Sequence, residues 1–429
     1  MTAYCQDVTY ADGDPRARTD GLGWVTRAIF ADPRLRLSTE PSADAAARYA
    51  VVPGLDRARF LLPLASARVT AASVLAYNAL RPPKVRAGRA AIGLLARTGA
   101  LALTKAPVLS VHVPAGVDPA TVLLTAHLAG VLGLGRLHAA IGIRPPDPHH
   151  KPTLQLFDDR GRPRGYAKIG WNDGTRAMVR AEAASLTGLP APVGDFPDAP
   201  GLTLHTQWQD REIAIIDPMP RRVRRIRRPH TPRIAAMLAV ARRGGEPATP
   251  RPLRGSTFLA TWRRRAIGAP DIVPAAIDAI EARDGDLLLE FGDWHGDWVP
   301  WNMGRHRGRL LVWDWENRAP DVPVGFDLAH QAFQTALSTH RRPAAEAADA
   351  ATAALQAHGG ALGLDAAAQR FVADAYLIEL WLRTYELSGG GAGWNPKLHP
   401  ALLHVLARRF PSLQDQSKDM PSRADNASL

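Results

Sequence analysis

The sequence predicts an α+β protein in which a strand-rich stretch is followed by a helix-rich one. Between residues 137 and 216, short apolar and β-branched runs alternate with turn residues, which is the pattern of antiparallel hairpins. From residue 234 onwards, apolar residues recur mainly at helical spacing. We therefore expect an N-terminal α+β region (1–134), a β-rich region (135–220), a helical region (221–410) and a polar, disordered tail (411–429).

The composition is that of a globular protein. The chain has 429 residues, enough for two or three domains, and its 46% hydrophobic and 22% charged content excludes wholesale disorder. Its start shows no basic segment followed by an apolar run, as a secretory signal would, and no stretch reaches eighteen uninterrupted apolar residues. The single cysteine, Cys5, cannot form an internal disulfide. We therefore expect a cytoplasmic enzyme.

The net charge of +12 favours anionic partners such as nucleotides, phosphorylated substrates, nucleic acid or an anionic membrane. Arginine outnumbers lysine by 47 to 6, however, and codon bias produces the same excess. The charge therefore indicates no clear nucleic-acid or membrane partner. The basic run from Arg221 to Arg228 is either a solvated linker or a surface for an anionic partner.

The N-terminal region carries signals for both helices and strands. Residues 49–53 and 58–63 predict a hairpin around Gly54-Leu55-Asp56, and residues 108–113 predict a further strand. Helical composition covers residues 65–80, 85–101 and 121–132. Nothing in this region indicates a function.

The β-rich region holds two charged residues of interest. Strands are predicted at 137–143, 154–157 and 165–169, a helix at 175–186, and a hairpin at 202–208 and 212–216. Lys168 lies on the third strand, and Glu182 stands fourteen residues later in the helix.

The segment that follows the hairpin reads Asp217-Pro218-Met219-Pro220. Proline has no N–H, so Met219 supplies the only main-chain donor among the three residues after Asp217.

The stretch from residue 287 to 316 gathers the polar residues of a candidate site. Residues 287–291 predict a short buried strand, and the loop after it carries His295, Asp297 and Asn302. A hairpin closed by Arg307-Gly308 is predicted next, and its second strand delivers Asp314. Carboxylate and amide oxygens are the ligands that a hard cation such as Mg²⁺ takes.

The spacing of these residues resembles the catalytic loop of the protein-kinase-like phosphotransferases. Asn302 follows Asp297 by five residues, and Asp314 follows Asn302 by twelve. Two motifs resemble those of the aminoglycoside phosphotransferase and choline kinase family. They are His295-Gly296-Asp297, which has HGD in place of the HRD of protein kinases, and Asp314-Trp315-Glu316, which has DWE in place of DFG. The resemblance implies a bilobal protein-kinase-like fold, with a small antiparallel β-lobe and a large, mainly helical lobe.

The same resemblance implies ATP and Mg²⁺ as cofactors and a small-molecule hydroxyl as acceptor, on a sugar, an amino alcohol or an antibiotic. It gives Asp297 the role of general base, and Asn302 and Asp314 that of metal ligands. His295 is expected to shape the loop rather than transfer protons. Glu316 is expected to bind either a second metal ion or a substrate group.

For the nucleotide, the resemblance implies that Lys168, paired with Glu182, holds the phosphates. The carbonyl of Asp217 and the N–H of Met219 are expected to hold the adenine at a hinge, although the same segment also reads as a plain interdomain turn. Asp327, at the start of a predicted helix, is expected to brace the catalytic loop.

Two features of the sequence stay open. Residues 144–150 contain no Gly-x-Gly-x-x-Gly, so the segment that covers the phosphates is not identified, and His149 and His150 are either phosphate contacts or part of a surface loop. Trp298 and Trp301 either pack in the core or form a stacking wall for a ring of the acceptor.

Two other functions are compatible with parts of the sequence. Asp293-Trp294-His295-Gly296 also spells the D-x-H-G that opens metallophosphoesterase sites, but no GNH-type motif follows it. The second alternative is a nucleotide-binding pseudokinase or scaffold that binds a partner through residues 1–134. Retention of all four key polar positions favours an active enzyme.

Overall fold

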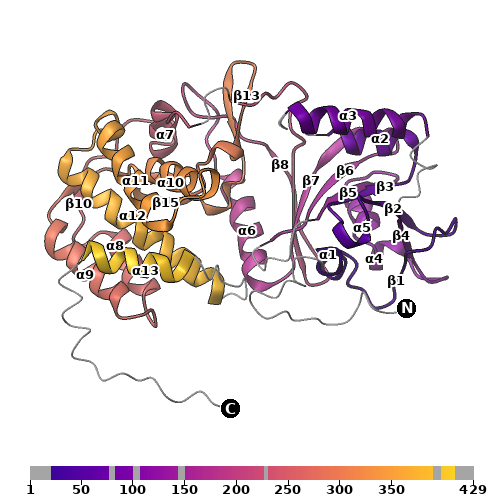
Figure 1. The fold of residues 1–429 in the computed structure, drawn as a ribbon, viewed down its shortest axis with the longest axis horizontal. Coiled ribbons are helices and arrows are strands. Elements are labelled where there is room, and N and C mark those ends of the chain that lie inside the picture. The colour runs from indigo at the N-terminus through magenta and orange to yellow at the C-terminus, as the bar shows by residue number, and fades with distance from the viewer. Residues whose placement is uncertain are drawn as a thin grey trace, which may run out of the picture.

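The computed structural model describes residues 21–76, 83–99, 107–143, 150–226, 230–389 and 398–410. It has a sheet-based lobe from the N-terminal half of the chain and a helical lobe from the C-terminal half, with helix α6 (Asp173–Thr187) between them (Figure 1). The predicted α+β architecture, with an antiparallel β-lobe followed by a mainly helical lobe, is confirmed. Predictions for residues 144–149, Arg227, Arg228 and the tail 411–429 lie outside the described residues.

Within the described residues, nine strands form one antiparallel sheet in the first lobe. In spatial order they are β1 (Arg36–Ser38), β4 (Val108–His112), β2 (Ala47–Val52), β3 (Phe60–Pro63), β5 (His138–Gly142), β6 (Thr153–Phe157), β7 (Pro163–Gly170), β9 (Arg211–Ile216) and β8 (Leu202–Trp208).

Helices pack on both faces of this sheet. Helices α1 (Gly21–Ile29) and α5 (Leu124–Val131), the latter preceded by the short α4 (Pro119–Val122), share an apolar core with one face. Helices α2 (Ala67–Leu75), α3 (Pro83–Arg97) and α6 pack against the other face. The second face is therefore the one that turns toward the helical lobe through α6.

The sheet runs without interruption across the boundary that the sequence suggests at residue 134. Strand β3 of the N-terminal region pairs with β5, with Leu61 opposite Ile141. Both residues are buried in the same core, which extends from α1 to β9. The N-terminal region thus enlarges the sheet of the small lobe, because its strands hydrogen-bond to those of that lobe.

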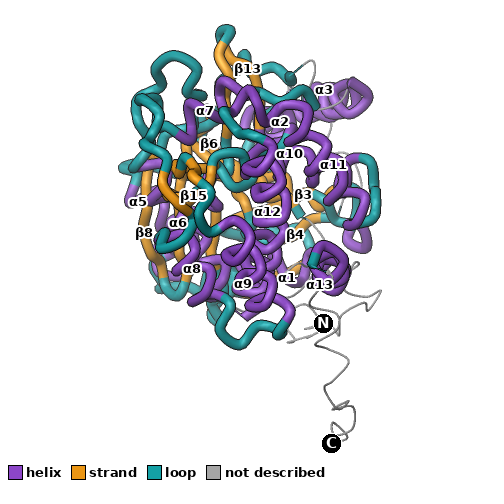
Figure 2. The backbone as a smooth tube through the Cα atoms, turned by 90° about the vertical axis from the view of Figure 1, so that its left-hand side faces the viewer, coloured by secondary structure: helices purple, strands orange, loops and turns teal. Residues whose placement is uncertain are grey.

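Helices dominate the second lobe. They are α7 (Ile234–Ala241), α8 (Thr257–Arg265), α9 (Ile272–Asp284), α10 (Phe326–Gln334), α11 (Ala344–His358), α12 (Ala366–Leu387) and α13 (Leu398–Arg409). Seen from the side of this lobe, its helices lie in front and the strands of the other lobe lie behind them (Figure 2). Helix α12 is buried along most of its length, yet no helix among the described residues is both long and apolar enough to cross a bilayer.

Short strands support the polar loop of the second lobe. They are β10 (Arg251–Pro252), β11 (Leu288–Leu289), β12 (Phe291–Trp294), β13 (Met303–His306), β14 (Arg309–Val312) and β15 (Ala319–Pro323). The predicted single strand 287–291 is wrong, because β11 pairs with β10 and β12 pairs with β15. The predicted hairpin is present, with β13 and β14 joined at Arg307 and Gly308, which both have positive φ.

Candidate active site

Lys168 joins the two lobes. It lies on β7, opposite Ala214 of β9, and is only 6% exposed. Its Nζ donates to Oε1 of Glu182 and to Oδ1 of Asp314, each at 2.5 Å. Glu182 belongs to α6, while Asp314 follows β14 in the helical lobe. One ammonium group therefore holds a carboxylate from each lobe.

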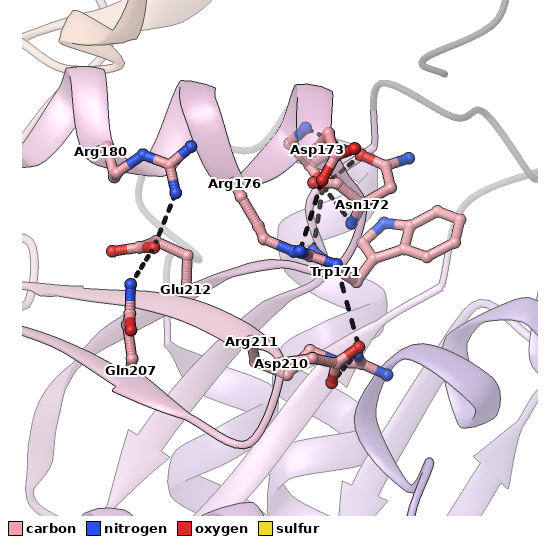
Figure 3. A network of polar contacts seen from close by, with 10 residues as sticks. Trp171, Asn172, Asp173, Arg176, Arg180, Gln207, Asp210, Arg211 and Glu212 are labelled. Atoms are coloured by element: carbon pink, nitrogen blue, oxygen red, sulfur yellow. Dashed lines mark hydrogen bonds and ion pairs between the residues drawn. The ribbon is translucent and has the colours of Figure 1, made fainter. Parts of the chain in front are cut away.

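Helix α6 is fixed by contacts that set the position of Glu182. Its start has a capping box, in which Asn172 and Thr175 satisfy each other's backbone N–H groups. Further along, Arg180 pairs with Glu212 of β9 at 2.9 Å, and Arg176 lies 3.9 Å from Asp210 in the β8–β9 turn (Figure 3). These contacts tie the helix to the strands beside β7, so Glu182 meets Lys168.

The ionisation of this group follows from burial and charge. Burial acts to lower the pKa of Lys168, but Asp314, Glu182 and Glu316 raise it well above its ordinary value, so the ammonium stays charged. Burial raises the pKa of Glu182 to about 7, against the opposing effect of Lys168. Burial also acts to raise the pKa of Asp314, and Lys168 holds it below its ordinary value.

The loop after β12 is held by a buried carboxylate. Asp327, in the first turn of α10, accepts hydrogen bonds from the N–H groups of His295 at 2.8 Å and Gly296 at 3.1 Å. Gly296 has φ +79°, and a Cβ there would collide with the carbonyl oxygen of Asn317. Only glycine fits this position, which explains the middle residue of the HGD motif.

Both carboxylate oxygens of Asp297 have hydrogen-bond partners. Asn302 donates from Nδ2 to its Oδ2 at 2.8 Å, and Nε2 of His330 lies 3.0 Å from its Oδ1. The hydroxyl of Tyr376 lies 3.1 Å from Nδ1 of His330, which leaves the Nε2 proton for Asp297. Burial acts to raise the pKa of Asp297, but the hydrogen bond from His330 prevails and lowers it to about 2.

His295 has a structural position in this loop. It is fully buried, its Nδ1 accepts from the N–H of Asp297 at 3.1 Å, and its Nε2 lies 3.2 Å from the carbonyl oxygen of Trp313. Burial lowers the pKa of His295 to about 4, so the ring is neutral near pH 7. A neutral ring with both nitrogens engaged shapes the loop and does not offer a proton.

The oxygens of Asn302 and Asp314 suit a hard cation. Asn302 commits its Nδ2 to Asp297, which leaves its Oδ1 as an oxygen donor. Asp314 stands in the left-handed conformation (φ 65°, ψ 60°) and presents its carboxylate beside Lys168. Among the described residues, no group of three or more His, Cys, Asp or Glu side chains could hold a metal ion. This donor set fits Mg²⁺, which typically takes few protein ligands and completes its shell with phosphate oxygens and water.

The predicted hinge residues stand at the end of β9. The N–H of Asp217 donates to the carbonyl of Gly201 at 2.8 Å, and its carboxylate accepts from Oγ1 of Thr203 at 2.7 Å. Met219 packs against Val223, Leu311 and Trp313. Within the described part of the chain, its N–H has no hydrogen-bond acceptor, so the donor noted in the sequence is available for a ligand.

Two residues of the site were missed in the sequence. His330 lies three positions after Asp327, one helical turn on along α10, so the helix that starts at Asp327 was the available signal. Lys151 lies 2.7 Å from Oε2 of Glu316, next to Lys168. Its signal was the scarcity of lysine, since the chain has only six.

The remaining candidate residues from the sequence are two tryptophans and Asp293. Trp298 is fully buried and packs edge-on against His295, so it cannot stack on an acceptor, whereas Trp301 is 48% exposed. Asp293 pairs with Arg243 and Arg318, so its carboxylate is engaged and the metallophosphoesterase alternative loses its first ligand.

The described part of the arginine run, residues 221–226, is a partly buried segment. Val223 and Ile226 are buried, and the backbone of Arg224 bridges to Arg305. Its four arginines, Arg221, Arg222, Arg224 and Arg225, are exposed, and His150, the described member of the histidine pair, is half-buried.

Comparisons with known proteins found matches only among solved structures. No protein-family model matches the chain, and no curated protein matches it. The chain is similar to aminoglycoside phosphotransferase APH(4)-Ia, with 12% identity, a TM-score of 0.44, and coverage of 66% of this chain and 98% of that one. It is similar to an amicoumacin kinase in complex with AMP-PNP, Ca²⁺ and Ami, with 13% identity, a TM-score of 0.36, and coverage of 62% of this chain and 86% of that one. It is also similar to ADP-bound aminoglycoside phosphotransferase APH(2'')-Ib, with 12% identity, a TM-score of 0.36, and coverage of 65% of this chain and 95% of that one. Two of the three belong to the family that the motifs resemble, and similarity at these TM-scores identifies neither an acceptor nor a mechanism for this chain.

Proposed function

We propose that this chain is an ATP-dependent O-phosphotransferase that acts on a hydroxyl group of a small molecule, with Mg²⁺ as the metal ion. The observation that carries the proposal is the double ion pair of Lys168. A buried ammonium that contacts Glu182 of one lobe and Asp314 of the other matches the lysine–glutamate ion pair and the neighbouring metal-binding aspartate of protein kinases.

Each residue of the site then has one task. Lys168 binds the phosphates of ATP, and Glu182 keeps its ammonium in place. Asn302 and Asp314 hold Mg²⁺, which neutralises charge on the phosphates when it is bound. The carbonyl of Asp217 and the free N–H of Met219 bind the adenine.

Asp297 orients the acceptor hydroxyl. With a pKa of about 2 it is a carboxylate throughout the physiological range, so it accepts a hydrogen bond well but is a weak base. This suits phosphoryl transfer, which asks the protein mainly for positioning and charge neutralisation. Its two fixed partners, Asn302 and His330, aim the carboxylate before the acceptor arrives.

The acceptor belongs to one of three classes: a sugar, an amino alcohol or an antibiotic with a free hydroxyl. Trp301 is the exposed ring of the catalytic loop and offers a flat surface to a cyclic acceptor. We also propose a cytoplasmic location, because ATP is available there as the phosphate donor.

The test is phosphate transfer from labelled ATP to a panel of sugars, amino alcohols, aminoglycosides and macrolides, with Mg²⁺ or with EDTA. We expect Mg²⁺-dependent transfer to at least one acceptor class and none from the Asp297→Ala variant. Nucleotide binding without transfer across the panel would instead favour the nucleotide-binding scaffold. Equal transfer by Asp297→Ala and the unmodified protein would refute the assignment of the site.

A further inference from the structure

A second lysine reaches the group of carboxylates around Lys168. Nζ of Lys151 lies 2.7 Å from Oε2 of Glu316, and Nζ of Lys168 lies 4.0 Å from the same oxygen. The side chains of Lys151 and Glu316 are 8% and 13% exposed. Two ammonium groups therefore converge on one carboxylate oxygen between the lobes.

The sheet explains why the two lysines meet. Thr153 of β6 stands directly opposite Lys168 of β7, and the ladder continues to Pro152, whose carbonyl accepts from the N–H of Ile169 at 3.0 Å. Side chains two residues apart on a strand share a face, so Lys151 emerges on the same side of the sheet as Lys168. That side faces α6 and the helical lobe.

The arrangement of charges leaves a place for an anion. Two ammonium groups this close repel each other unless an anion lies between them, and Glu316 provides that anion here. Beyond Glu316, the Lys151 ammonium contacts only the thioether of Met178 at 3.8 Å, a weak acceptor, within the described residues. Its ammonium therefore has donor capacity to spare for a ligand.

The segment before Lys151 lacks the glycine-rich loop that binds phosphate in many nucleotide-binding proteins. A glycine-rich loop binds phosphate through successive backbone N–H groups, but residues 144–150 read Arg-Pro-Pro-Asp-Pro-His-His. Three of these seven residues are prolines, which have no N–H. Fewer backbone N–H groups are therefore available to phosphates in this segment, and the next residue, Lys151, offers an ammonium group.

We propose that Lys151 is a second phosphate-binding lysine, held by Glu316 until the polyphosphate of a nucleoside triphosphate enters the cleft. The inference rests on the proposed function and adds to it a residue that replaces the missing glycine-rich loop. Lys168 and Lys151 then bind the phosphates from neighbouring strands, and Glu316 keeps Lys151 oriented toward them.

The experiment measures the binding of adenosine, AMP, ADP and ATP by calorimetry, in the presence of Mg²⁺, for the unmodified chain and for Lys151→Met. Lys84→Met is the matched control, because Lys84 is exposed on α3. Loss of a hydrogen bond to a charged group predicts that Lys151→Met weakens ATP binding by roughly 10- to 100-fold. Adenosine should bind to Lys151→Met as it does to the unmodified chain, and Lys84→Met should change nothing.

Three results would overturn the proposal. If the unmodified chain and Lys151→Met bind ATP equally, Lys151 has no phosphate role, while the proposed function stands. If Lys151→Met loses adenosine and ATP to the same extent, the lysine only supports the cleft. If the unmodified chain binds no nucleotide, the proposed function and this inference fall together.

A double-variant comparison separates direct from indirect action. In a Glu316→Gln background, Lys151→Met should still weaken ATP binding, because the ammonium itself contacts the phosphates. If the effect of Lys151→Met vanishes in that background, Lys151 acts only by holding Glu316, and the proposal is refuted.

Discussion

His330 provides a sharp test of how the catalytic carboxylate is oriented. The side chain is fully buried between Asp297 and Tyr376, at 3.0 Å and 3.1 Å. Replacing it with alanine removes the donor to Oδ1 of Asp297 and leaves Asn302 as the remaining fixed partner. The carboxylate can then rotate away from the acceptor hydroxyl.

The size of the effect follows from this one hydrogen bond. A hydrogen bond to a charged group contributes about 1.5–3 kcal/mol, which corresponds to roughly 10- to 150-fold in rate if the orientation is lost completely. The side chain of Asp297 is 31% exposed, so water can replace part of the bond. We therefore expect His330→Ala to lower kcat toward the small end of that range, about 10- to 30-fold.

The pH profile should shift as well. Burial acts to raise the pKa of Asp297, and the bond from His330 is the main effect that keeps it at about 2. Without His330 the pKa of Asp297 rises, so the carboxylate becomes protonated at higher pH. The acid limb that reports Asp297 lies below the measured range in the unmodified enzyme, and in His330→Ala it should move up so that kcat falls toward pH 4.5.

The assay is steady-state transfer to the best acceptor from the panel, between pH 4.5 and 8, with KM measured for ATP. KM for ATP should stay unchanged, because His330 does not contact the Lys168 group. His404→Ala, on the exposed surface of α13, is the control and should behave as the unmodified enzyme. An unchanged kcat and acid limb in His330→Ala, or a loss confined to KM for ATP, would refute the orienting role.

Three further predictions concern the same site. Asp297→Ala should abolish transfer and leave ATP affinity nearly intact in a calorimetric titration, and a large loss of affinity would contradict its role toward the acceptor. Asp314→Ala should remove the dependence of ATP binding on Mg²⁺, whereas an unaltered difference between Mg²⁺ and EDTA would exclude it as a metal ligand. Gly296→Ala should lower the thermal midpoint more than Gly308→Ala, because both positions have positive φ, costing about 1–3 kcal/mol for a side chain, but only at Gly296 would the new Cβ also strike the carbonyl of Asn317. Equal shifts for the two glycines would contradict that account.

The local sequence pattern was enough to predict much of the fold and the three residues of the ion-pair group. Strands β6, β7, β8 and β9 and helix α6 lie close to where the alternation and helical spacing of apolar residues predict them. Lys168, Glu182 and Asp314 could be chosen because their motifs and spacing resemble those of the protein-kinase-like phosphotransferases. The structure brings all three within one ion-pair group.

The pairing of strands that lie far apart along the chain could not be predicted from the sequence. The strand β3 could have ended a separate domain, and only its hydrogen bonds to β5 make the sheet continuous. Trp298 and Trp301 have the same chemistry and lie three residues apart, yet one is fully buried and the other is exposed. Burial depends on which faces of the helical lobe meet the loop, and a pattern along the chain does not contain that information.

The same reason explains the two residues that complete the site. Helix α10 brings His330 within hydrogen-bonding distance of Asp297. The pairing of β6 with β7 brings Lys151, just before β6, next to Lys168 and within ion-pair distance of Glu316. Residue type, spacing and the resemblance to a known family therefore predicted the groups proposed to do the chemistry. The packing of strands and helices selected their partners, since charge and hydrogen bonding act over a few ångströms in space irrespective of separation along the chain.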